Sequence, residues 1–213
     1  MTTIELLQKT KAAWPALSAA PAEEKNRLLL AMADALEEST PAILAANAQD
    51  MADAEGHISA VMLDRLRLDE GRIRAMADGV RAAAALPDHT GRILSETHHA
   101  NGMTIYKKQV PLGLVAIIYE SRPNVTSDAA ALAIKSGNAC ILRCGKEAWR
   151  SANAIVKALR QGLVENGLPE AAVSLIEDTS HASANALMTA VGYVDLLIPR
   201  GGAGLIRACV ENA

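Results

Sequence analysis

The segment from residue 110 to residue 147 constrains the fold of this 213-residue chain more than any other. Leu114–Tyr119 is a short apolar run rich in β-branched residues, and a helical pattern over Asn124–Lys135 and a second apolar run over Ala139–Arg143 follow it. Apolar runs that are too short for helices are typical of strands buried on both faces of a parallel sheet. A strand, a crossover helix and a parallel strand form a βαβ unit, so the sequence predicts an α/β fold.

Polar and basic residues follow both predicted strands. They are Glu120–Asn124 after the first strand and Arg143–Glu147 at the end of the second. Ligands of open parallel sheets bind beyond the carboxyl ends of the strands. We therefore expect a site for an anionic ligand at this edge.

The remaining chain adds helices before this unit and further strands after it. Residues 3–86 have helical apolar spacing, as in the stripe formed by Leu28, Leu29, Met32 and Leu36. Later patterns predict helices over 149–165 and 181–191, strands over 173–177 and 194–199, and a last helix that reaches Ala213. We predict three parts: a helical layer (1–87), a projecting β-hairpin (88–110) and an open, Rossmann-like parallel sheet (111–213) that is incomplete at its end.

The hairpin prediction rests on Asn101-Gly102, which lies between two alternating segments within residues 92–110. This dipeptide favours a two-residue type I′ turn, in which both central residues have positive φ. A lone two-stranded hairpin is marginal in water, and its edges invite pairing. We therefore expect the hairpin to pair with another subunit of a homo-oligomer.

Composition excludes several classes of function. A net charge of −3 and an aromatic content of 2% argue against nucleic-acid binding, which needs a basic face and stacking side chains. No apolar run is long enough for a membrane span, and the N-terminus lacks the apolar core of a signal peptide. Three cysteines without metal-ligand spacing fit a reducing compartment. We expect a soluble, cytoplasmic protein without a metal site.

Two groups of residues are candidates for binding a nucleotide. The turn Arg200–Gly204 follows a strand and opens a helix, so its backbone N–H groups can cradle a pyrophosphate. Its spacing differs from G-x-G-x-x-G, and an ordinary tight turn is the alternative. Arg143 and Lys146, with Gly145 between them, can meet a ribose or a phosphate, and solvated surface charge is the alternative.

Asn124 and Cys144 are candidates for catalysis. The amide of Asn124 can donate to a developing oxyanion, while the alternative is an N-cap of the helix that follows. Cys144 stands beside two cations that would lower its pKa, but no histidine base is placed to activate it. Cys140, in the middle of a strand, is expected to be a buried apolar side chain, and Cys209 lies in the last helix.

Several longer runs carry a resemblance to a known family. They are YESRPNVT (119–126), KSGNACILRCGKEA (135–148), GLPEAAVSLIED (167–178) and YVDLLIPRGGAGLI (193–206), with ANAQD (46–50) and MLDRL (62–66) in addition. With these runs the whole chain resembles the γ-glutamyl phosphate reductases, which are the glutamate-5-semialdehyde dehydrogenases of proline biosynthesis in the aldehyde dehydrogenase superfamily.

The resemblance implies the NADPH-dependent reduction of L-glutamyl 5-phosphate to L-glutamate 5-semialdehyde and phosphate. It implies that Asn124 is the oxyanion-hole asparagine, which outweighs a capping role. It also implies that Arg143, Gly145 and Lys146 meet the adenosine ribose, with Lys146 attracting the 2′-phosphate of NADPH.

The resemblance places Gly201 and Gly202 at the pyrophosphate. Glu120 and Arg122 are peculiar to the reductases, and we expect them to bind the substrate. A further expected partner is the kinase that makes the acyl phosphate.

The resemblance also implies that the nucleophilic cysteine lies beyond Ala213. The chain is then expected to be about the first half of the enzyme, to supply the cofactor-binding half and to be inactive by itself. Two alternatives stay open, which are a non-catalytic nucleotide-binding module and a self-association module that assembles through the hairpin.

Overall fold

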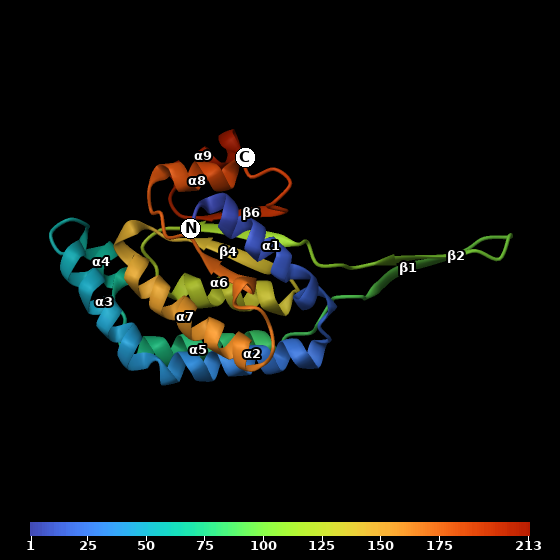
Figure 1. Ribbon diagram of the computed structural model, residues 1–213, viewed down its shortest axis with the longest axis horizontal. Coiled ribbons are helices and arrows are strands. Elements are labelled where there is room, and N and C mark those ends of the chain that lie inside the picture. Colours follow the sequence, from blue (N-terminus) through green and yellow to red (C-terminus); the bar gives the residue numbers. More distant parts are fainter.

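The computed structural model describes residues 1–213 and is built in layers around one parallel sheet (Figure 1). Helices α6 and α7 cover one face of the sheet, and α2 and α5 pack outside them, with α3 and the short α4 beyond their end. Helices α1, α8 and α9 lie on the opposite face. The helices are α1 (Thr3–Ala19), α2 (Ala22–Glu38), α3 (Thr40–Ala54), α4 (Ala60–Leu66), α5 (Glu70–Ala85), α6 (Asn124–Lys135), α7 (Trp149–Glu165), α8 (His181–Met188) and α9 (Ala203–Asn212).

The parallel sheet has the strand order β5-β4-β3-β6. From β3 the chain moves through α6 and α7 toward β5, and α8 then takes it to the other face and places β6 beside β3. The order therefore reverses between β3 and β6, and such switch points are where open α/β sheets bind their ligands. The strands are β3 (Leu114–Tyr119), β4 (Ala139–Arg143), β5 (Val173–Leu175) and β6 (Leu196–Arg200).

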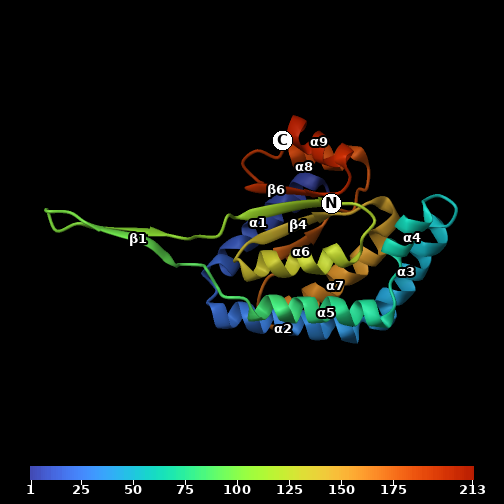
Figure 2. The same ribbon diagram turned by 180° about the vertical axis from the view of Figure 1, so that it is seen from behind.

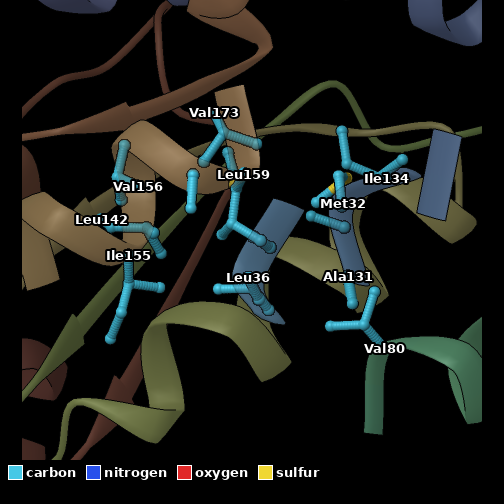
Figure 3. Close-up of a cluster of buried hydrophobic side chains, with 14 of the residues drawn as sticks. Met32, Leu36, Val80, Ala131, Ile134, Leu142, Ile155, Val156, Leu159 and Val173 are labelled. Carbon is cyan, nitrogen blue, oxygen red and sulfur yellow. The ribbon is translucent and has the colours of Figure 1, made fainter. Parts of the chain in front are cut away.

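Two apolar cores fill the two faces of the sheet, as expected for a parallel sheet covered by helices. Alternate β3 residues Val115 and Ile117 point toward α6 and α7, where the larger core also takes in α2 and α5. Leu114 and Ala116 belong to the smaller core under α1 and α8. Figure 3 shows side chains of α2, α5, α6 and α7 meeting those of β4 and β5 in the larger core.

The fold agrees with the predicted α/β class and with each predicted element, while three boundaries shift. Strand β5 ends at Leu175, α8 ends at Met188, and β6 runs two residues later than predicted at its start. Asp195 explains the late start of β6, because its carboxylate accepts the Leu114 N–H at 2.8 Å and its own N–H donates to the Leu114 carbonyl. No helix combines the length and apolar character needed to cross a membrane.

Helices α2 and α7 approach each other closely at Gly162. A Cβ atom built on Gly162 would lie 2.7 Å from the Met32 nitrogen and 2.8 Å from the Ala31 carbonyl carbon. These are backbone atoms of α2, which cannot rotate aside as the end of a side chain can. The missing side chain of Gly162 is therefore a condition of the helix packing.

The antiparallel hairpin projects away from the layered body (Figure 2). It consists of β1 (Ile93–His98) and β2 (Thr104–Lys108), and all of β1 is exposed. The predicted type I′ turn at Asn101-Gly102 is wrong, because Gly102 alone has positive φ, at 84°. His99 pairs with Met103, and the Gly102 N–H donates to the His99 carbonyl, so three residues form the loop and glycine takes the left-handed position.

A buried ion pair fixes the base of the hairpin to α2. The Lys25 side chain is 1% exposed, and its Nζ contacts the Asp88 carboxylate at 2.5 Å and donates to the Thr90 hydroxyl at 3.1 Å. Burial raises the pKa of Asp88, but hydrogen bonds from Lys25 and Thr90 outweigh it and hold the pKa below its ordinary value. Asp88 is therefore held in its charged form.

Candidate active site

The loops after β3, β4 and β6 converge at the carboxyl edge of the sheet. A Cβ atom on Gly145 would lie 3.4 Å from the Ser121 nitrogen and 3.0 Å from a carboxylate oxygen of Glu147. The Ser121 hydroxyl donates to that same Glu147 carboxylate at 3.1 Å. The loops after β3 and β4 therefore pack against each other at Gly145.

The glycine turn after β6 lies at the switch point and holds the carboxylate of Glu120. Glu120 follows β3, and its Oε1 accepts the Gly202 N–H at 3.0 Å. A Cβ atom on Gly201 would lie 2.7 Å from the Glu120 carboxyl carbon, so the turn passes close beside this side chain. Glu120 sits at the N-terminus of α9, where unpaired N–H groups and the helix dipole favour negative charge.

This turn fits an anionic group of a bound ligand, since it already attracts one of the chain's own carboxylates. A phosphate that bound there would have to displace Glu120 or share the N–H groups of α9 with it. The fold thus brings together Glu120 and the glycines Gly201 and Gly202, which are three of the predicted site residues.

Arg143 and Lys146 differ in how free they are. The Arg143 guanidinium donates to the Thr179 and Ser180 carbonyls, at 2.6 and 3.0 Å, and so fixes the loop after β5. The Lys146 side chain forms no hydrogen bond or ion pair, and it lines a cavity of about 750 Å³ together with Glu177 and Thr179. Of the two cations, Lys146 is the one available to a ligand.

Asn124 and Arg122 line a second cavity, of about 440 Å³, beyond the end of β3. The alternative role of Asn124 as an N-cap is wrong, because the helix starts at Asn124 itself and Pro123 precedes it without a side-chain cap. The exposed Asn124 amide and the Arg122 guanidinium form no hydrogen bonds within the chain, so both donors are free. Neither touches Glu120 through a side-chain hydrogen bond.

The thiols are buried and unreactive. Burial raises the pKa of Cys140 and of Cys144 to about 12, and nearby Arg143 only partly offsets the effect at Cys144. Burial also raises the pKa of Cys209. None of these groups is a thiolate at neutral pH, which is the form that a nucleophile needs.

Sequence reasoning missed the roles of Asn47 and Asp50 on α3. Asp50 accepts the backbone N–H and the hydroxyl of Ser151, each at 2.7 Å, and so caps the start of α7. Asn47 donates to the Leu66 carbonyl and accepts the Leu68 N–H at 2.8 Å. Both side chains are buried. Asp50 positions α7, which follows Lys146 in the chain, and Asn47 positions the connection between α4 and α5. Two polar residues at helical spacing within an apolar pattern were the available signal.

The chain places no group of three or more histidine, cysteine, aspartate or glutamate side chains where they could hold a metal ion. His98 and His99 lie on the hairpin, and His98 is engaged with Glu96 and Thr104 instead.

The sequence is similar to curated γ-glutamyl phosphate reductases. The protein of that name from Streptococcus suis is 59% identical over 212 residues, which are 100% of this chain and 52% of the relative. The one from Neisseria meningitidis serogroup B is 58% identical over 211 residues, covering 99% of this chain and 50% of the relative. The chain thus spans about half the length of the curated relatives that it matches.

Solved structures agree with this similarity. The crystal structure of γ-glutamyl phosphate reductase from Thermotoga maritima superposes with a TM-score of 0.97 at 38% identity, over 99% of this chain and 51% of that one. The structure of the same enzyme from Saccharomyces cerevisiae gives a TM-score of 0.89 at 29% identity, over 100% and 54%. The model of the aldehyde dehydrogenase family matches residues 2–201. The chain therefore belongs to the aldehyde dehydrogenase family.

Proposed function

We propose that the chain is the cofactor-binding part of an NADPH-dependent γ-glutamyl phosphate reductase of proline biosynthesis, acting in the cytoplasm. The reaction reduces L-glutamyl 5-phosphate to L-glutamate 5-semialdehyde and releases phosphate. The observation that carries the proposal is that the glycine turn at α9, the unpaired Lys146 and the free amide of Asn124 all follow the carboxyl ends of strands of one sheet. Whole-length similarity to reductases of that name supports it.

The nicotinamide cofactor supplies the hydride when it is bound. In this proposal Gly201 and Gly202 offer backbone N–H groups to the pyrophosphate, with Glu120 moving aside, and Lys146 provides the positive charge for the 2′-phosphate. Arg143 contributes by holding the loop after β5 against the ribose side of the site. Residues 1–87 and 111–213 form one folded unit in this proposal, because both contribute side chains to the larger core.

Asn124 and Arg122 act on the substrate. A thiolate from a part of the enzyme outside this chain attacks the acyl phosphate, and the Asn124 amide donates to the oxygen that becomes negative. Arg122 neutralises the phosphate that leaves. Both groups are available because they form no hydrogen bonds within the chain, and they line one cavity.

A cofactor titration with Lys146 variants tests the first half of the proposal. The purified chain is titrated with NADPH and NADH, and quenching of Trp14 and Trp149 fluorescence reports binding. The chain should prefer NADPH, and Lys146→Met should lose about tenfold of that preference while NADH affinity stays unchanged. Lys157→Met, on the exposed side of α7, is the matched control. Equal affinity of the unaltered chain for both cofactors would refute the assignment.

Substitution of Asn124 in the complete enzyme tests the second half. Asn124→Ala should lower kcat about 10²- to 10³-fold with little change in KM for the acyl phosphate, since the amide acts as charge develops. A change in KM alone would mean that Asn124 binds substrate and does not stabilise the oxyanion.

The hairpin supports a proposal about assembly. Its strands expose Ile93, Leu94, Ile105 and Tyr106, each by about half, together with unpaired edges. We propose that it pairs with a second copy of the chain in a homo-oligomer. Deletion of residues 94–108 should lower the mass in solution to that of a monomer, as measured by light scattering. An unchanged oligomeric mass would exclude this role. The kinase that makes the acyl phosphate is a second proposed partner.

A further inference from the structure

The second cavity, between α4, α5 and the start of α6, is lined by charged side chains to which the reaction proposed above assigns no role. Its volume of about 440 Å³ suits a small molecule. This cavity is here called the arginine pocket, and its charged and polar lining residues are Asp64, Arg65, Arg67, Arg72, Arg122, Asn124 and Asp128.

One of the four arginines is structural. The Arg72 guanidinium donates to the Arg67 carbonyl at 2.7 Å and to the Asp64 carboxylate at 2.9 Å, which fixes the connection between α4 and α5. Arg65 and Arg67 form no side-chain hydrogen bond or ion pair within the chain, and neither does Arg122. The pocket therefore offers three free guanidinium groups, and these recognise carboxylates and phosphates through paired N–H donors.

Asp128 is the acidic side chain of this pocket that has no partner, since Asp64 is paired with Arg72. It lies four residues after Asn124, on the same face of α6, and its carboxylate lies 3.6 Å from where a Cβ atom on Gly79 of α5 would be. Burial raises the pKa of Asp128, and Arg200 only partly offsets this. The carboxylate forms no hydrogen bond and no ion pair with the arginines of the pocket. A half-buried carboxylate without a partner is costly unless a ligand supplies one.

We propose that the arginine pocket binds the amino-acid end of the substrate, with the α-carboxylate on Arg65 and Arg67 and the α-ammonium group on Asp128. Arg122 and Asn124 are then left for the acyl phosphate end. The ligand class is an α-amino acid with a second anionic group on its side chain. This inference rests on the proposed function and adds to it the residues that select an amino acid over a simple dicarboxylic acid.

Two probes that differ only in the ammonium group test the inference. The ¹⁵N-labelled chain is titrated with L-glutamate and with glutarate, and the amide signals of residues 60–68 and 124–130 are followed by NMR. The unaltered chain should bind L-glutamate about tenfold more tightly than glutarate, because a charge-assisted hydrogen bond to Asp128 is lost with glutarate. This comparison needs no variant.

Variants then separate the roles of the side chains. Asp128→Asn should abolish the preference for L-glutamate and leave glutarate affinity equal or higher, since a charge that repels carboxylates is removed. Arg65→Gln with Arg67→Gln should weaken both probes at least tenfold. Arg74→Gln, on an exposed arginine of α5 outside the pocket, should change neither.

Several outcomes would overturn the inference. Equal affinity of the unaltered chain for the two probes would remove the role of Asp128, and so would a preference that survives Asp128→Asn. Absence of shifts near the pocket with either probe would refute the site itself. If NADPH still shifts the α9 amides in that sample, the cofactor proposal stands and this inference alone fails. If the probes bind as expected and NADPH does not, the cofactor proposal fails and this inference stands.

Discussion

Substitution of Gly162 by alanine tests the packing of α2 on α7. The new Cβ atom would lie 2.7–2.8 Å from backbone atoms of Ala31 and Met32, whereas ordinary contacts begin at 3.4 Å. Both neighbours are main-chain atoms in the middle of a helix, so relief requires the two helices to move apart along the larger core. We therefore expect a loss of stability from a residue that normally favours helices.

The size of the loss follows from two opposing terms. Overpacking a core costs about 1–3 kcal/mol, while replacing a helical glycine by alanine gains about 0.8–1.0 kcal/mol. Because the new contacts are with backbone atoms, the cost falls in the upper part of that range, at about 2–3 kcal/mol, and the expected net destabilisation is about 1–2 kcal/mol. For a domain of this size, that lowers Tm by about 2–8 °C.

Gly79→Ala provides the matched control. Gly79 also lies inside a helix, α5, but its new Cβ atom would meet only a side-chain oxygen of Asp128 at 3.6 Å. This variant should be stabilised by about 0.4–1 kcal/mol. Urea unfolding followed by far-UV circular dichroism measures both variants. If the Gly162→Ala protein is as stable as the unaltered chain, the close approach of α2 and α7 does not limit the side chain at residue 162. If the two variants change stability equally, helix propensity alone explains both changes.

Three further predictions concern the site and its supports. Glu120→Gln should raise NADPH affinity about tenfold, because the carboxylate at the glycine turn repels a pyrophosphate; an unchanged Kd in a fluorescence titration would contradict this. Asp88 has a lowered pKa, so its stabilising effect is present above its unfolded-state pKa of about 4 and is lost as pH falls through the lower folded-state value. The stability gap between the unaltered chain and Asp88→Asn should thus narrow below about pH 4 in urea titrations, and a gap independent of pH would mean that Asp88 keeps one charge state throughout. Asp50→Ala should lower the free energy of unfolding in urea by about 1–3 kcal/mol, because it leaves donors of α7 unpaired. Asp53→Ala, on the exposed side of α3, should change it by less than about 0.5 kcal/mol. Equal losses in the two variants would show that surface charge is responsible.

Local patterns predicted the elements well, because their causes are local. The apolar run at Leu114–Tyr119 is buried at every position, as an interior strand of a parallel sheet requires. The turn at Asn101-Gly102 failed for a physical reason. The pairing of His99 with Met103 sets the loop at three residues, and this length selects a different turn from the one that the dipeptide favours.

Contacts between distant residues could not be predicted from patterns. Glu120 and Gly202 are 82 residues apart, and only the strand order that places β6 beside β3 brings the carboxylate to the glycine turn. The Arg143 guanidinium donates to the Thr179 and Ser180 carbonyls, 36 and 37 residues away, and no local pattern indicates these contacts. The direction in which a side chain points depends on neighbours that are distant in the sequence. The strand end that the residue follows can be predicted from the local apolar run.

The exposed hairpin has a consequence for how the native molecule opens. Both strands bond only to each other, and β1 has no buried residue, so separating them costs no core contacts. Amide hydrogens at residues 93–108 should exchange with deuterium through cheap local opening, while those of β3 should require far larger unfolding. Slow exchange in the hairpin would therefore report directly that another strand covers it, and its dependence on protein concentration would measure the strength of that association.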